Sequence, residues 1–291
     1  MRYLILLVFA LILSSCSSTK KIVDNTPKQE SKEVVEVKNE ATPQVEDIPV
    51  TTEVPEKTEV TTEVKDITVQ ETIIASTEAF NHNIWHKLLT QHVSDAGNVD
   101  YKSFKSNRKP LTNYITSLGK NMPIDTWKKE DKLAYWINAY NALTIDLILR
   151  NYPLQSIKDI KDPWEQRLWK LGDKWYNLEE IEHQILRKME EPRIHFAIVC
   201  ASFSCPKLQN EAFTALNLDT QLTNATKEFL SDKNRNDISQ SDLKLSKIFK
   251  WFKKDFEQNG SLIDFLNKYS DISISEKANK SYLDYNWDLN N

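Results

Sequence analysis

The chain has 291 residues, of which 40% are hydrophobic and 27% are charged, and its formal net charge is −4. This length allows one or two domains, and the near-neutral charge balance argues against a nucleic-acid partner recruited by bulk charge. Only four glycines are present, which excludes a glycine-rich fibre and leaves no glycine cluster for a phosphate-binding loop.

The N-terminus has the pattern of a secretory signal peptide. Arg2 precedes an apolar run over residues 4–13, and small residues lead up to Cys16. This run is shorter than the roughly 20 apolar residues that a membrane-spanning helix needs. Leu13-Ser14-Ser15-Cys16 resembles a bacterial lipobox, in which the cysteine thiol is acylated and begins the mature chain. We therefore expect residues 1–15 to be a lipoprotein signal peptide, the alternative being an ordinary cleaved signal with a chance cysteine.

The expected lipid on Cys16 predicts attachment to a membrane. The residue after the cysteine is Ser17 rather than aspartate, which resembles the sorting pattern for the outer membrane. No acidic run follows at once, so we expect the protein to be anchored at the outer membrane with its domain facing the periplasm.

Residues 16–79 have the composition of a spacer. Lys, Glu, Thr, Val and Pro dominate, no aromatic residue occurs between Ala10 and Ala79, and Pro43, Pro49 and Pro55 interrupt any strand. Such a segment cannot bury enough apolar surface to fold, so we expect a disordered tether.

Residues 80–291 contain all eight tryptophans and the helical periodicity. Apolar spacing predicts helices over 80–93, with Ile84, Leu88 and Leu89 near one face, then 111–118, 126–150, 177–188 and 216–230. The helix predicted over 177–188 has Asn177 as its expected N-cap and Glu180 at N3. Short helices are expected over 248–256 and 261–268, with an extended segment at 98–101.

Two segments predict β structure. Residues 194–200 are apolar apart from His195, which favours a buried strand in which His195 faces away from Cys200. Ile238 and residues 243–245 predict a small hairpin. The expected fold is α+β: one helix-rich domain over 80–291 with a small β-sheet.

Candidate chemistry gathers around two cysteines, Cys200 and Cys205, five residues apart. In an oxidising periplasm such a pair is first a disulfide candidate. The alternative is a nucleophilic thiolate, with His183 as the base and Glu182 to orient it. A third possibility is a zinc site with four ligands, namely His183, His195, Cys200 and Cys205. Their spacings match no compact zinc motif, so we expect no metal and no cofactor.

The helix over 126–150 carries unusual polar residues. Asn138 and Asn141 lie three apart on one side of it, although asparagine is a poor helix former. They either pin a neighbouring loop or, with Trp136 and His195, form the polar floor of a ligand cleft. Other tryptophans could line such a cleft, namely Trp164, Trp169 and Trp175.

Several motifs of the globular part form a specific combination. They are Tyr135-Trp136-Ile137-Asn138-Ala139-Tyr140-Asn141, Ile181-Glu182-His183, Arg193-Ile194-His195-Phe196-Ala197, Ser204-Cys205-Pro206 and Tyr285-Asn286-Trp287-Asp288-Leu289-Asn290. Together they resemble the domain-of-unknown-function family 547 (DUF547) over roughly residues 88–291, with Asn286 where the family pattern has an aspartate. The resemblance implies a secreted or lipid-anchored bacterial protein and brings no assigned reaction.

Two functions are therefore expected as alternatives. The first is a periplasmic domain that binds an unidentified peptide or small-molecule ligand or partner in the cell envelope. The second is a cysteine-dependent hydrolase or transferase for peptide-like substrates, similar to papain or transglutaminase, with Cys205 or Cys200 as the nucleophile. A papain-like fold has its nucleophilic cysteine at the start of the central helix, whereas the comparable helix of this chain carries Asn138 and no cysteine.

Overall fold

The computed structural model describes residues 78–291. The expected signal peptide, the lipidation site at Cys16 and nearly all of the expected tether lie outside these residues. Within this range no helix combines the length and the apolar character needed to cross a bilayer. The described part is rich in helix and carries two small sheets, which confirms the predicted α+β class.

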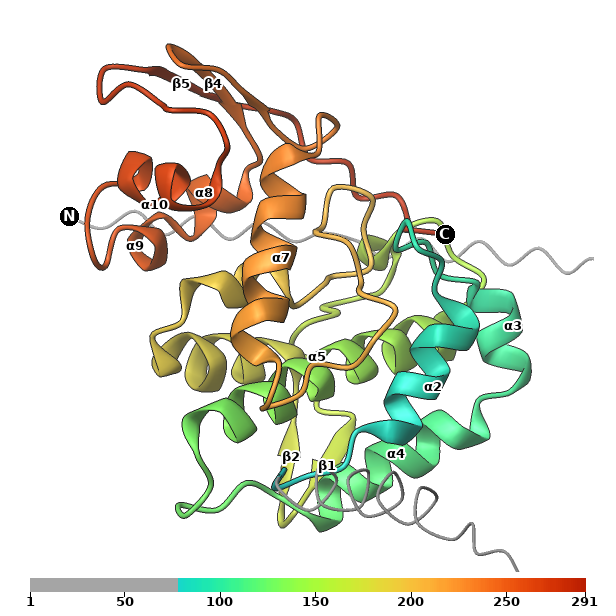
Figure 1. The fold of residues 1–291 in the computed structure, drawn as a ribbon. Coiled ribbons are helices and arrows are strands. Elements are labelled where there is room, and N and C mark those ends of the chain that lie inside the picture. Colours follow the sequence, from blue (N-terminus) through green and yellow to red (C-terminus); the bar gives the residue numbers. More distant parts are fainter. Residues whose placement is uncertain (1–77) are drawn as a thin grey trace, which may run out of the picture. The chain divides into compact units, whose positions relative to one another are not determined.

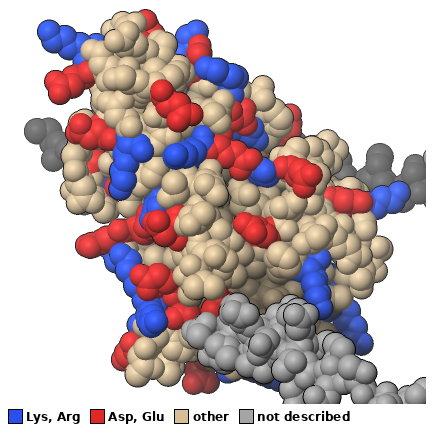
Figure 2. Space-filling model, in the orientation of Figure 1, with Lys and Arg blue, Asp and Glu red and all other residues tan. Residues whose placement is uncertain are grey.

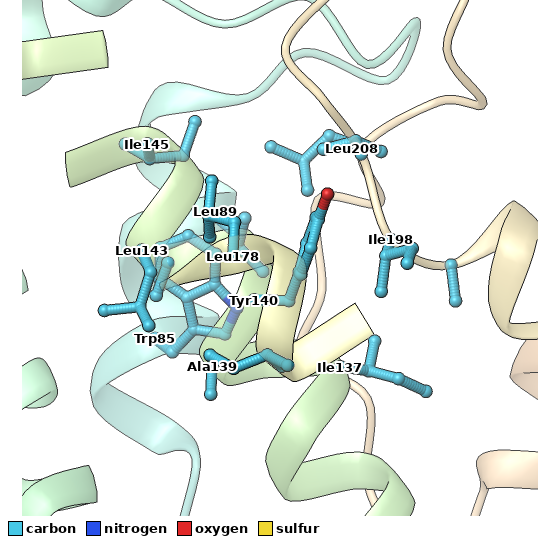
Figure 3. Close-up of a cluster of buried hydrophobic side chains, with 14 of the residues drawn as sticks. Trp85, Leu89, Ile137, Ala139, Tyr140, Leu143, Ile145, Leu178, Ile198 and Leu208 are labelled. Atoms are coloured by element: carbon cyan, nitrogen blue, oxygen red, sulfur yellow. The ribbon is translucent and has the colours of Figure 1, made fainter. Parts of the chain in front are cut away.

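The core is built around α5 (Lys129–Asn151), whose side chains are buried on nearly every face. A helix that is apolar all round must be surrounded by other elements. In Figure 1, α2 (Asn83–His92), α3 (Tyr101–Ser106) and α4 (Lys109–Lys120) gather on one side of α5. Figure 3 draws part of the resulting cluster, which takes in Trp85, Leu143 and Ile198.

Most helices predicted from periodicity are confirmed, with boundaries shifted by a few residues. In α2, Leu88 and Leu89 reach the core as predicted. Ile84 was predicted wrongly: it is 43% exposed, and Trp85 is buried instead. Helix α5 ends before Pro153, as expected, because the residue ahead of a proline avoids the helical region.

The helix expected over 177–188 forms, but it changes character along its length. Asn177 caps its start by accepting from the Glu180 N–H at 2.8 Å, as predicted. The Glu180 carboxylate completes no capping box and instead pairs with Arg167 and Lys174. Helix α6 (Leu178–Glu180) continues as a π turn (Ile181–Ile185) and a 3-10 turn (Leu186–Met189).

The strand predicted over 194–200 was wrong. Residues Pro192–Phe196 form a 3-10 helix, and the chain beyond it is irregular. Its buried backbone is satisfied by a side chain of α5: Asn141 donates to the Ala197 carbonyl at 2.9 Å and accepts from the Val199 N–H at 3.0 Å. The side-chain amide of Asn141 thus supplies the hydrogen bonds that a neighbouring strand would have supplied. The continuous apolar sequence of this segment indicates only that it is buried, and hydrophobic periodicity does not distinguish a buried irregular segment from a buried strand.

The C-terminal half forms a second hydrophobic cluster. It contains α7 (Leu218–Ser231), α8 (Ile248–Trp251), α9 (Lys253–Phe256) and α10 (Leu262–Tyr269). The predicted hairpin is confirmed as β3 (Asp237–Ile238) and β4 (Asp242–Leu245), to which β5 (Asn279–Tyr282) adds in parallel. A separate hairpin joins β1 (Trp169–Leu171) and β2 (Lys174–Tyr176).

Surface charge is mixed in sign. Figure 2 shows acidic and basic side chains interspersed over the described part of the face in view. This distribution agrees with the near-neutral composition.

Candidate functional site

A cavity of about 350 Å³ lies where segments distant in sequence meet. Helix α5, the π turn, the segment after the 3-10 helix, α8 and the C-terminal segment all contribute to it. Its walls combine aromatic rings, carboxyl groups, two histidines and both cysteines, namely Tyr140, Trp164, Glu165, Glu179, Glu182, His183, His195, Ile198, Cys200, Cys205, Pro206, Ile248, Trp251, Phe252, Tyr285 and Trp287. An apolar pocket with a few convergent polar groups is the usual form of a small-molecule site.

One wall is a connected cluster of aromatic rings. The ring centroids of Trp251 and Tyr285 lie 4.8 Å apart, those of Tyr285 and Trp287 4.5 Å apart, and those of Trp164 and Trp287 5.9 Å apart. The C-terminal segment is held in place because Ser156 donates to the Trp287 carbonyl at 2.8 Å. The rings are therefore fixed while part of their surface still faces the cavity.

Glu182 is a buried carboxyl group in the cavity wall. The Tyr140 hydroxyl donates to Glu182 Oε2 at 3.0 Å. Glu182 lies in the π turn, a backbone geometry often found at functional sites. Burial raises the pKa of Glu182 to about 7, against the opposing effects of the Tyr140 hydrogen bond and the Arg187 charge. A carboxyl group that titrates near neutral pH can both give and take a proton.

The raised pKa of Glu182 predicts a pH-dependent stability. Its proton is bound more tightly in the folded state, so the folded protein loses stability as pH rises from about 4.5 to about 7. We expect Glu182→Gln to match the wild type near pH 4 and to exceed it by up to about 3 kcal/mol at pH 8. Urea unfolding at a series of pH values measures this difference, and parallel curves for the two proteins would contradict it.

A chain of charged and polar groups lies beside Glu182. Arg187 donates from Nε and Nη2 to the two oxygens of Asp255, at 2.6 and 2.8 Å. Asp255 also lies 2.8 Å from His195 Nε2. Burial alone would raise the pKa of Asp255, but the hydrogen bonds from Arg187 and His195 hold this pKa well below its usual range. Asp255 is therefore a carboxylate, and His195 donates to it.

These contacts fix the tautomers of the two histidines. Burial lowers the pKa of both His183 and His195, so both rings are neutral near pH 7. Arg187 has only donors and lies 2.7 Å from His183 Nδ1, so the His183 proton is on Nε2. His195 donates from Nε2, which leaves its Nδ1 as an acceptor. The partners thus favour His195 over His183 as a proton acceptor, in an arrangement in which a carboxylate orients the ring.

The structure joins Cys200 and Cys205 in a disulfide, with their Cα atoms 6.3 Å apart. Cys205 is buried and Cys200 is half-buried. The Cys200 N–H donates to Cys205 Sγ at 2.9 Å, and the Tyr285 hydroxyl lies 3.3 Å from each sulfur. In this oxidised state neither sulfur is a nucleophile.

The structure brings together five of the residues proposed from sequence: Glu182, His183, His195, Cys200 and Cys205 all line the cavity. Asn138 and Asn141 do not. Both are fully buried and pin loops, Asn138 through the Phe213 carbonyl and N–H, at 2.7 and 3.0 Å.

The tryptophans singled out from sequence divide between core and surface, with one exception. Trp136 packs against Tyr135 and Tyr176 in the core, Trp169 is buried, and Trp175 is 52% exposed on β2. Of the expected cleft tryptophans, Trp164 alone lines the cavity.

Sequence reasoning missed several lining or supporting residues. Trp251, Tyr285 and Trp287 form the aromatic wall, Tyr140 hydrogen-bonds Glu182, and Asp255 orients His195. Tyr285 and Trp287 belong to the closing aromatic motif, so their density near the C-terminus was a usable signal. Nothing local marks Asp255, since its partners come from elements 60 or more residues away.

Across residues 78–291 no group of three or more His, Cys, Asp or Glu side chains is arranged to hold a metal ion.

Comparison with known proteins gives a match to a family model. No curated protein and no solved structure matches the chain. The family model described as "Protein of unknown function, DUF547" matches residues 124–230. This stretch contains α5, the π turn and both cysteines. It includes the lining residues from Tyr140 to Pro206, which are about two thirds of those in the cavity wall.

Proposed function

We propose that the domain binds a small organic or peptide ligand in the cavity lined by Trp164, Trp251 and Trp287. The observation that carries the proposal is the combination of a fixed aromatic wall with carboxyl and imidazole groups in one concave site. Aromatic rings supply apolar contact area and attract cations to their faces. The neighbouring Glu165, Glu179 and Glu182 favour a ligand that carries a positive charge or hydrogen-bond donors beside an apolar body.

Ligand-observed NMR with a library of acylated amino acids and aromatic amines tests this proposal. We expect hits whose affinity falls about five- to thirtyfold in Trp251→Ala, since a stacked or cation–π contact is worth about 1–2 kcal/mol. Trp175→Ala is the matched control, because Trp175 is similarly exposed but lies outside the cavity. Equal losses in both variants, or hits unaffected by either, would contradict the proposal.

We further propose that this binding occurs in the cell envelope, with the chain anchored at the outer membrane through a lipid on Cys16. The support is the lipobox-like Leu13-Ser14-Ser15-Cys16 sequence and the spacer-like composition that follows it. Metabolic labelling with a fatty acid is expected to mark the wild-type chain and not Cys16→Ser. Equal labelling of both would refute the anchor.

A second candidate is a cysteine-dependent hydrolase or transferase for peptide-like substrates. The observation that favours it is that both sulfurs share the cavity with His195, whose Nδ1 is oriented as a proton acceptor by Asp255. The activity requires the reduced pair. The test is the hydrolysis of fluorogenic peptide amides under reducing conditions, in which Cys200→Ala or Cys205→Ala is expected to abolish fluorophore release while the fold persists. An absence of turnover by the reduced wild type would exclude this candidate.

A further inference from the structure

The Cys200–Cys205 disulfide is poorly placed for a structural staple. It closes a short loop, and the entropy that a crosslink removes from the unfolded chain is smallest for short loops. It also reaches the wall of the cavity, where Cys200 is half-buried.

The loop between the two cysteines is held without the disulfide. Phe203 donates its N–H to the Asp288 carbonyl at 2.7 Å, and Ser204 donates to the Asn286 carbonyl at 3.1 Å. Arg235 donates to the Phe203 and Cys205 carbonyls, each at 2.6 Å. These bonds tie the loop to two other segments, so it keeps its position when the sulfur–sulfur bond opens.

The two sulfurs have different surroundings. Cys200 is half-buried at the cavity wall, whereas Cys205 is only 2% exposed. A thiol that enters the cavity therefore reaches Cys200 first. In thiol–disulfide exchange the accessible sulfur is attacked, and the other departs as a thiolate.

The departing sulfur would be stabilised by fixed donors. The Cys200 backbone N–H already points at Cys205 Sγ from 2.9 Å. Ser202 donates to the Tyr285 hydroxyl at 3.2 Å, which frees the Tyr285 proton for Cys205 Sγ at 3.3 Å. Donors of this kind stabilise a thiolate and make it a better leaving group.

We propose that the Cys200–Cys205 pair is a redox-active disulfide that exchanges with thiol-bearing molecules admitted to the aromatic cavity. The incoming thiol loses its proton, its sulfur forms a bond to Cys200 Sγ, and Cys205 leaves as a thiolate. A second external thiolate then attacks the external sulfur of the mixed disulfide, the bond to Cys200 Sγ breaks, and Cys200 leaves as a thiolate. The protein gains two electrons and two protons as the dithiol, and the two external thiols leave as one oxidised disulfide.

Glutathione, used as the probe, tests the proposal on the full-length chain carrying Cys16→Ser, so that only this pair reports. Acid quenching and intact mass follow the sulfur species, and circular dichroism follows the fold. We expect glutathione to reduce the oxidised pair without unfolding. Cys205→Ser, treated with oxidised glutathione, is expected to accumulate a mixed disulfide on Cys200, whereas Cys200→Ser leaves the buried Cys205 at least about tenfold less modified.

Tyr285→Phe separates this chemistry from packing. It keeps the ring but removes the donor, so exchange is expected to slow by about tenfold, the effect of one hydrogen bond to a charged group. Tyr282→Phe on β5 is the matched control and is expected to exchange at the wild-type rate. A pair that resists glutathione in the folded protein, a fold lost on reduction, or equal modification of the two single-cysteine variants would overturn the proposal. These readouts concern sulfur chemistry, so they stand or fall separately from ligand affinity.

Discussion

Asp146→Ala is expected to lower the free energy of unfolding by about 2–4 kcal/mol, because it leaves the buried Trp169 N–H unpaired and removes the acceptor of two partly exposed arginines, Arg108 and Arg150. Asp146 lies on α5 and is 1% exposed. It accepts from Arg108, from Arg150 Nε at 2.7 Å and from Trp169 Nε1 at 2.8 Å. Alanine leaves these donors without their acceptor, and the Trp169 indole is buried where water cannot replace it.

Chemical denaturation of the variant measures the loss. Asp237→Ala is a matched control, because Asp237 forms an exposed ion pair with Lys233 at 3.6 Å and such pairs contribute less than about 1 kcal/mol. Asp146→Asn is expected to lie between the two, since it keeps one oxygen acceptor. A loss for Asp146→Ala no greater than that of the control would contradict the role given to this carboxylate.

Asn141→Ala is expected to cost about 2–4 kcal/mol, because it leaves two buried backbone groups, the Ala197 carbonyl and the Val199 N–H, without partners. Asn151→Ala removes an amide from the exposed end of the same helix and is expected to cost much less. Denaturation midpoints compare the two variants.

The Asn141 prediction also reaches the cavity. Val199 directly precedes Cys200, so the backbone that Asn141 holds also positions the accessible sulfur. We expect Asn141→Ala to alter the rate of glutathione exchange under conditions in which the variant remains folded. An unchanged rate, with stability lost, would show that Asn141 supports the fold alone.

The helices were predictable because their signals are local. Helix α5 follows from apolar spacing and from Pro153, and the start of α6 follows from the Asn177 cap. The segment 194–200 was mispredicted because its hydrogen-bond partner is a side chain 56 to 58 residues away, which no local pattern reveals.

The candidate site was predictable only in part, for the same reason. Glu182, His183, His195 and the cysteines stood out because polar or reactive residues interrupt apolar sequence. Trp251 and Trp287 join them through tertiary packing of the C-terminal segment, and Asp255 through ion pairing across 60 or more residues. Asn138 and Asn141 were also conspicuous in the sequence, but for a different reason. Their side chains hydrogen-bond neighbouring loops and do not line the cavity.

The indole N–H signals of the eight tryptophans test the ligand site most directly. In a ¹⁵N–¹H NMR titration with a bound fragment from the acylated amino acid and aromatic amine library, we expect saturable shifts of the Trp164, Trp251 and Trp287 signals. The exposed Trp175 indole, outside the cavity, should not move. Shifts confined to Trp175 or spread evenly over all the exposed rings would show that the fragment binds elsewhere, and would contradict the cavity as the functional site.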